Sequence, residues 1–124
     1  MSNVIYTPDA PAAIGPYSQA IVAGGLVFTS GQIPINPATG NVEAVTIQEQ
    51  TEQVCKNIAA VLTAAGSSLE KVVKTVCFLS DMNDFAAFNA VYAKYLTGKP
   101  ARSCVAVKTL PKNVRVEVDT IAEI

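Results

Sequence analysis

VVKTVCFL, residues 72–79, is a run of apolar and β-branched residues interrupted only by Lys74. A run of this length is too short for a separate domain and is typical of a strand in the interior of a sheet. We therefore expect residues 72–79 to form a central, largely buried strand, against which the rest of the chain folds.

A helical pattern precedes this strand. Thr46 and Glu49 have the Thr-x-x-Glu spacing of a capping box, and Gly66 is suited to end a helix. Apolar residues recur at helical spacing between these limits, at Val54, Ile58, Val61, Leu62 and Ala65. The pattern predicts an amphipathic helix from about 46 to 66.

A second helical pattern follows the strand. Asp84 has a side chain suited to an N-cap, and Gly98 and Pro100 are expected to stop the helix. One face of this helix carries large apolar and aromatic residues, namely Phe85, Phe88, Tyr92, Tyr95 and Leu96. The sequence therefore predicts a helix from about 84 to 96 whose aromatic face packs inward.

The remaining strands are expected in pairs at the two ends of the chain. Strands at about 18–23 and 26–31 are separated by Gly24-Gly25, a dipeptide suited to a tight hairpin turn. Strands at about 103–109 and 114–121 follow the second helix, and the last alternates valines with charged residues. The order β-β-α-β-α-β-β predicts an α+β domain over residues 1–124, with an antiparallel or mixed sheet and both helices on one face.

Composition limits the classes of function. The 124 residues have a mass of 13.0 kDa, are 50% hydrophobic and only 15% charged, and carry a net charge of −1. The surface of a monomer of this size would carry few charged side chains. We therefore expect part of it, the free face of the sheet, to be buried in subunit interfaces. This net charge gives no sign of the positively charged surface with which proteins bind the phosphates of nucleic acids. No segment resembles a membrane span or a signal peptide, and a cytoplasmic location is expected.

The absence of histidine restricts the chemistry further. It excludes Ser-His-Asp and Cys-His catalysis and His-ligated zinc. The cysteines Cys55, Cys77 and Cys104 match no metal-ligand spacing and are expected to be reduced thiols. We therefore expect a site without metal or organic cofactor.

Six polar side chains near predicted strand ends and turns remain as candidates, each with a structural alternative. Arg102 offers a planar fork for a carboxylate, but it could also be an ordinary solvated arginine. Glu117 shares a strand face with other charged residues, and it would act as a base only in a buried setting. Cys104 is better explained as a small buried residue than as a nucleophile. Tyr17, Ser30 and Asn89 are equally compatible with interface, turn and helix roles. The residues alone indicate a site for a small anion.

Five segments of the chain resemble the RidA/YjgF family of enamine/imine deaminases, and the match spans nearly the whole sequence. They are Ala13-Ile14-Gly15-Pro16-Tyr17-Ser18-Gln19-Ala20, Ser30-Gly31-Gln32-Ile33-Pro34, Asp81-Met82-Asn83-Asp84-Phe85, Pro100-Ala101-Arg102-Ser103-Cys104 and Val116-Glu117. The connection at 97–99 looks shorter than in several relatives, and this loop shapes the approach to Arg102.

The resemblance implies a chorismate-mutase-like α+β fold, a homotrimer with pockets between subunits, and hydrolysis of 2-aminoacrylate-type enamines and imines to 2-oxo acids and ammonia. It assigns Arg102 to the substrate carboxylate and Glu117 to the attacking water. Further pocket-lining positions implied by it are Tyr17, Ser30, Gly31, Asn89 and Cys104, with Cys104 acting through its backbone rather than its thiol, and Phe88 is expected to close the apolar wall. Small imine or 2-oxo acid ligands are the expected partners.

Two other functions compete with this one. A non-catalytic binding or regulatory module for 2-oxo acids or amino acids would use the same carboxylate clamp. RNA cleavage, also attributed to relatives, is disfavoured by the net charge, the missing histidine and the lack of an aromatic and basic sheet motif.

Overall fold

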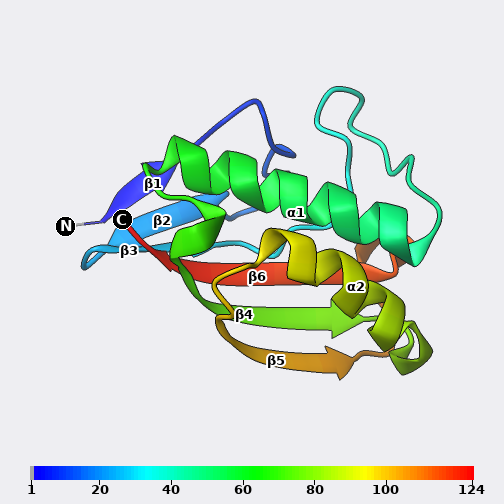
Figure 1. Cartoon of the computed structure of the whole chain (residues 1–124). Helices are drawn as coiled ribbons and strands as arrows, with labels where there is room; N and C mark the ends of the chain where they lie inside the picture. Colours follow the sequence, from blue (N-terminus) through cyan, green and yellow to red (C-terminus); the bar gives the residue numbers. More distant parts are fainter. Residues whose placement is uncertain (1) are drawn as a thin grey trace.

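The run at 72–79 forms strand β4 (Val72–Leu79) of a six-stranded sheet with the order β1-β2-β3-β6-β4-β5. The computed structural model describes residues 2–124. The other elements are β1 (Asn3–Ile5), β2 (Ala20–Ala23), β3 (Leu26–Thr29), β5 (Ala101–Ala106), β6 (Val116–Glu123), α1 (Ile47–Ala64) and α2 (Phe85–Tyr95) (Figure 1). Three short 3-10 turns lie at Leu69–Lys71, Met82–Asp84 and Pro111–Asn113.

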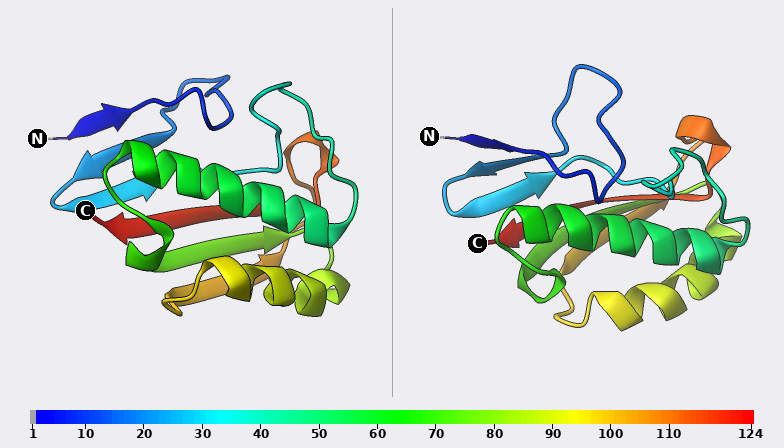
Figure 2. Two further views of the ribbon diagram at one scale, coloured as in Figure 1. Left: turned by 45° about the horizontal axis from the view of Figure 1, so that its top comes forward. Right: turned by 90° about the horizontal axis from the view of Figure 1, so that it is seen from above.

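The sheet is mixed, as predicted. β4 pairs with β6 in an antiparallel arrangement and with β5 in a parallel one, and α2 forms the crossover connection from β4 to β5. Both helices cover the same face (Figures 1 and 2). Their apolar sides pack there on buried side chains that include Val27, Cys77, Leu79 and Val118. The α+β class and the placement of both helices on one face are therefore confirmed.

Helix α1 has the predicted ends. The Thr46 hydroxyl accepts a hydrogen bond from the Glu49 amide at 3.1 Å, and the Glu49 carboxylate accepts one from the Thr46 amide at 3.2 Å. Gly66, just beyond the helix, has a φ of +82°, a value that L-residues with a Cβ rarely adopt. Local sequence signals fix both ends of this helix.

The start of α2 differs from the prediction. Asp84 is at the N-cap position but makes no capping hydrogen bond. Asp81, three residues earlier, instead accepts a hydrogen bond from the Asn83 amide at 2.8 Å and caps the short 3-10 turn at Met82–Asp84. The Asp84 carboxylate lies 3.4 Å from Arg115 Nη1, so a tertiary contact has taken it away from the helix terminus.

Strand boundaries account for most of the other corrections. β1 was not predicted, because it has three residues and is recognisable only by its pairing with β2. β5 begins at Ala101 rather than 103, since its parallel register with β4 starts there. β6 is displaced to Val116–Glu123, since Val114 and Arg115 belong to the connection from the turn at Pro111–Asn113.

The face of the sheet away from the helices is open in the single chain. In the described chain no helix covers it (Figure 2). β4 is therefore buried on one face only, which corrects the expectation of a largely buried strand. The open face carries apolar side chains from four strands together with a few charged ones: Phe28, Val76, Phe78, Val105, Ile121, Lys74, Glu117 and Asp119. None of the helices in the described range has the length and apolar character that a bilayer crossing requires.

Candidate active site

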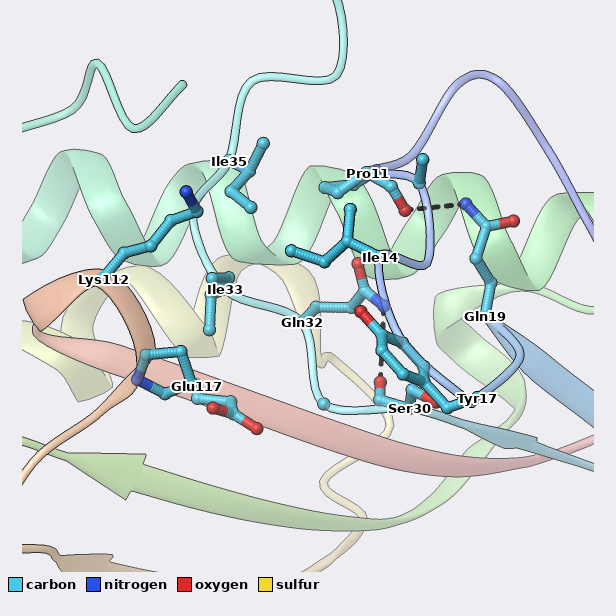
Figure 3. A pocket seen from close by; sticks show the side chains of 13 residues that line it. Pro11, Ile14, Tyr17, Gln19, Ser30, Gln32, Ile33, Ile35, Lys112 and Glu117 are labelled. Carbon is cyan, nitrogen blue, oxygen red and sulfur yellow. Dashed lines mark hydrogen bonds between the residues drawn. The ribbon is translucent and has the colours of Figure 1, made fainter. Parts of the chain in front are cut away.

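One cavity lies between the segment that precedes β2, the segment that follows β3 and the start of β6. Its volume is about 410 Å³. It is mainly apolar, with a few polar groups (Figure 3); its lining residues are Pro11, Ala12, Ile14, Tyr17, Gln19, Ser30, Gly31, Gln32, Ile33, Ile35, Pro111, Lys112 and Glu117. Four of the predicted site residues, Tyr17, Ser30, Gly31 and Glu117, therefore share one cavity.

Glu117 is held close to the backbone at Gly31. Gln32 and Val118 exchange backbone hydrogen bonds of 2.8 and 3.1 Å, which keep the segment after β3 beside β6. A Cβ atom at Gly31 would lie only 2.0 Å from Glu117 Oε2. Glycine at position 31 therefore leaves the space that the Glu117 carboxylate occupies.

The environment of Glu117 favours its protonated form. Burial raises the pKa of this carboxyl group above its usual value, and the nearby Asp119 carboxylate raises it further. Burial also raises the pKa of Asp119, which follows Glu117 on the same face of β6. Glu117 is therefore half-buried in surroundings that raise its pKa, whereas strand alternation alone made it a solvent-facing carboxylate.

A buried glutamine fixes the loop that carries Tyr17. The Gln19 side chain donates hydrogen bonds to the carbonyl oxygens of Thr7 (3.0 Å) and Pro11 (2.8 Å), and its own oxygen accepts one from the Thr7 amide (2.7 Å). The Ser30 hydroxyl donates to the Ser18 carbonyl at 2.6 Å. Tyr17 itself is 51% exposed at the cavity.

A second buried amide holds the opposite wall. Asn57 of α1 donates to the carbonyl oxygens of Ile33 and Ile35 at 3.1 and 2.9 Å. Sequence reasoning assigned no role to Gln19, Asn57 or these isoleucines. Gln19 was within a quoted motif, but no local pattern shows that a side chain bonds backbone groups eight to twenty-four residues away.

The second cavity surrounds Arg102. It has a volume of about 370 Å³ and is lined by the last turns of α2 and the 97–100 connection: Asn89, Tyr92, Ala93, Leu96, Thr97, Lys99, Pro100 and Arg102. Arg102 Nη1 donates to Asn89 Oδ1 at 2.7 Å, and the guanidinium carbon lies 4.9 Å from the centroid of the Tyr92 ring. Arg102 is therefore an ordered cation rather than a freely solvated one. Between residues 2 and 124 no carboxylate lies within ion-pair distance of it.

Phe88 and Cys104 line neither cavity of the single chain; the placement of Phe88 is a correction, whereas the buried thiol of Cys104 agrees with its interpretation as a small buried residue. Phe88 is fully buried in the core, where its ring centroid is 5.4 Å from that of Tyr92, and it lines neither cavity. Phe88 lies on the side of α2 that packs against the sheet. Its ring therefore belongs to the core and not to the wall of a pocket, contrary to the prediction. Cys104 is half-buried and packs against the core, and burial raises the pKa of its thiol. A thiolate at Cys104 is therefore disfavoured.

Arg102 and Glu117 do not meet within one chain. Arg102 is paired with Thr75 of β4 and lies on the helix face, whereas Glu117 is paired with Phe78 and lies on the open face. Two strand spacings and three residues of offset place their Cα atoms roughly 14 Å apart. No single small substrate can contact both side chains of the same chain. In the described residues, no three His, Cys, Asp or Glu side chains cluster as a metal site.

The fold is that of a known group of proteins; a crystal structure of the Escherichia coli YjgF gene product superposes with a TM-score of 0.93 at 45% identity and covers 98% of each chain. Residues 7–124 match the family model described as endoribonuclease L-PSP, which is the RidA/YjgF family. The chain belongs to the RidA/YjgF family.

Similar proteins in this family carry different names. The chain is 54% identical over 123 residues to a RutC family protein of Pyrococcus horikoshii, covering 98% of each chain. It is 48% identical over 126 residues to the 2-iminobutanoate/2-iminopropanoate deaminase of Escherichia coli, again covering 98% of each. The crystal structure of Escherichia coli TdcF with bound serine is 42% identical, covers 98% of each chain and has a TM-score of 0.94.

The contact between Gly31 and Glu117 gives a first prediction for this RidA/YjgF protein. Gly31→Ala should push the Glu117 carboxylate out of its buried position, because the new Cβ would need the space of Oε2. The pKa of Glu117 should then fall towards its usual value, as measured by a carboxyl ¹³C NMR titration. Ser30→Ala, which adds no atom beside the carboxylate, is the control. An unchanged Glu117 pKa in Gly31→Ala would contradict the packing described.

Proposed function

We propose that the protein hydrolyses enamines of the 2-aminoacrylate type and their 2-imino acid tautomers to 2-oxo acids and ammonia. Arg102 binds the substrate carboxylate, and Glu117 orients and deprotonates the attacking water. The observation that carries the proposal is an ordered guanidinium without an acidic partner, combined with a half-buried carboxylate in a largely apolar cavity. The name of the Escherichia coli relative supports the same reaction.

The reaction requires little of the protein. Because the iminium carbon is already electrophilic, the protein has mainly to orient the substrate and the water and to transfer protons between them. Glu117 accepts a proton from water as the water oxygen bonds to this carbon, giving a carbinolamine. Glu117 returns this proton to the nitrogen; as the C–N bond breaks and ammonia leaves, the carboxylate takes the proton of the carbinolamine hydroxyl, which becomes the carbonyl of the 2-oxo acid, and then releases it to the departing ammonia. An elevated pKa suits a group that must both accept and return a proton.

The proposed site lies between protomers of a homotrimer. Arg102 and Glu117 are on opposite faces of the sheet in one chain, so a shared substrate needs Arg102 from a neighbouring copy. Arg102 is on β5, the edge strand of the sheet, where a neighbouring copy can approach. The open face, with Phe28, Phe78 and Val105, offers an apolar surface for that contact.

A binding module is the second candidate, because serine is bound in the TdcF relative and a carboxylate clamp serves binding as well as catalysis. The two functions are separated by a coupled assay in which a pyridoxal-phosphate-dependent dehydratase generates 2-aminoacrylate. We expect the protein to accelerate pyruvate and ammonia formation over the spontaneous rate. Saturable pyruvate or serine binding without any acceleration would favour the binding module.

The pKa shift of Glu117 predicts the pH dependence of this activity. Glu117 must be ionised to accept a proton, so kcat/KM should rise with pH through its pKa and then level off. The rise should lie above the value of about 4.3 that is usual for glutamate. Because the Asp119 charge raises the Glu117 pKa, Asp119→Asn should move the rise to lower pH. A pH profile that is the same in the wild type, Asp119→Asn and Glu117→Gln would contradict the role of Glu117.

A further inference from the structure

One face of α2 forms a cradle for the Arg102 guanidinium. The guanidinium carbon is 5.4 Å from the centroid of the Phe85 ring and 4.9 Å from that of Tyr92, and Nη1 donates to Asn89 Oδ1 at 2.7 Å. Phe85, Asn89 and Tyr92 are spaced at i, i+4 and i+7, which places them on the same side of the helix. The contacts with Arg102 thus come from a single rigid element.

The cradle orders the cation without neutralising it. A carboxylate partner would compete with the substrate carboxylate for the same donors, whereas an aromatic face attracts the cation and uses none of them. Asn89 occupies one of the five N–H groups of the guanidinium. The remaining donors stay available for a ligand.

Tyr92 is itself anchored to the sheet. Its hydroxyl is 2.8 Å from Thr75 Oγ1, and both residues are buried. Thr75 of β4 is the register partner of Arg102 in β5. The Phe88 ring supports Tyr92 from the core side. Burial raises the pKa of the Tyr92 phenol, so its hydroxyl stays protonated and hydrogen-bonded at neutral pH.

We propose that Tyr92 and Thr75 are positioning residues for the carboxylate-binding arginine. Thr75 fixes the Tyr92 ring relative to β4, and the ring fixes the Arg102 guanidinium relative to the same strand. Both residues act through Arg102: Tyr92 by the contact of its ring with the guanidinium, and Thr75 by its hydrogen bond to Tyr92. The effect on substrate binding rests on the proposed function, whereas the ordering of Arg102 does not.

The ordering is tested first by NMR on the ligand-free protein. In the wild type, the Arg102 Nε–Hε resonance should be shifted by the nearby rings and protected from rapid exchange. Tyr92→Leu should remove the ring-current shift, and Thr75→Val should change it while leaving the ring in place. The control is Tyr95→Phe, which removes a hydroxyl on the same helix that bonds Glu52 and is not in the cradle. An Arg102 resonance that is identical in wild type, Tyr92→Leu and Thr75→Val would overturn the proposal, whatever the activity of the protein.

The second measurement separates positioning from a general effect on folding. Steady-state kinetics with 2-iminopropanoate should show KM raised about tenfold in Tyr92→Leu and by less in Tyr92→Phe, which keeps the ring, with kcat within about twofold of wild type. The double variant Tyr92→Phe/Thr75→Val removes both hydroxyls and leaves neither unpaired, which provides a folded check if a single variant is unstable. A loss of kcat with unchanged KM in the folded variants would overturn the role. Absence of turnover in the wild type would instead reject the proposed function, and the NMR result would still decide the positioning.

Discussion

Arg102→Ala is expected to lower kcat/KM for 2-iminopropanoate about 100-fold. Arg102 is the ordered cation of its cavity and can bind a carboxylate through two parallel hydrogen bonds. Losing charge-assisted bonds worth about 3 kcal/mol corresponds to a factor of about 100. The measurement is the enzyme-dependent decay of the imine at substrate concentrations below KM.

The chain provides a matched control for this variant. Arg115 is the other arginine of the sequence; it is exposed, pairs with Asp84 and lines neither cavity. Arg115→Ala should therefore retain nearly full activity. Arg102→Lys should recover only a small part, because lysine keeps the charge but loses the planar fork. Wild-type activity in Arg102→Ala would remove Arg102 from the mechanism.

Mixing two inactive variants should restore activity. If each site combines Arg102 of one protomer with Glu117 of another, random trimers of Arg102→Ala and Glu117→Gln chains should contain intact sites at about a quarter of all positions. We therefore expect about a quarter of the wild-type rate after co-refolding, compared with almost none for either variant alone. The readout is the same imine decay assay.

Two controls make the mixing experiment decisive. Native mass spectrometry should show trimers that contain both chains. Arg102→Ala mixed with the double variant Arg102→Ala/Glu117→Gln should stay inactive, since no protomer then supplies the arginine. If the first mixture also stays inactive although mixed trimers have formed, the site lies within one chain and the shared geometry is wrong.

The local parts of the fold were predictable because their signals are local. The capping box at Thr46 and Glu49, the left-handed turn at Gly24-Gly25 and the β-branched run at 72–79 each depend on neighbours within a few residues. Predictions that needed a distant partner were less accurate. β1 was missed because its three residues are a strand only beside β2, and Asp84 lost its capping role to a contact with Arg115.

In the candidate site, too, features that depend on residue type were predictable, whereas features that depend on distant contacts were not. The residue types that could carry the chemistry, above all Arg102 and Glu117, could be named from the sequence. Their surroundings could not: Phe88 belongs to the core, and Gln19 and Asn57 hold the cavity walls from far along the chain. Alternation along β6 indicated a solvent-facing Glu117, but the segment at Gly31 covers this position.

The sequence by itself determined the family, both ends of α1, the absence of histidine chemistry and the two residues that we propose as the principal site residues, because these depend on residue type and short-range spacing. Only the tertiary structure decided that Arg102 and Glu117 lie on opposite faces of one sheet and that Phe85, Asn89 and Tyr92 surround the arginine. The physical reason is that the period of a strand fixes which of its own residues share a face. The relation between residues of different strands depends on pairing and register, which are set by contacts between distant parts of the chain.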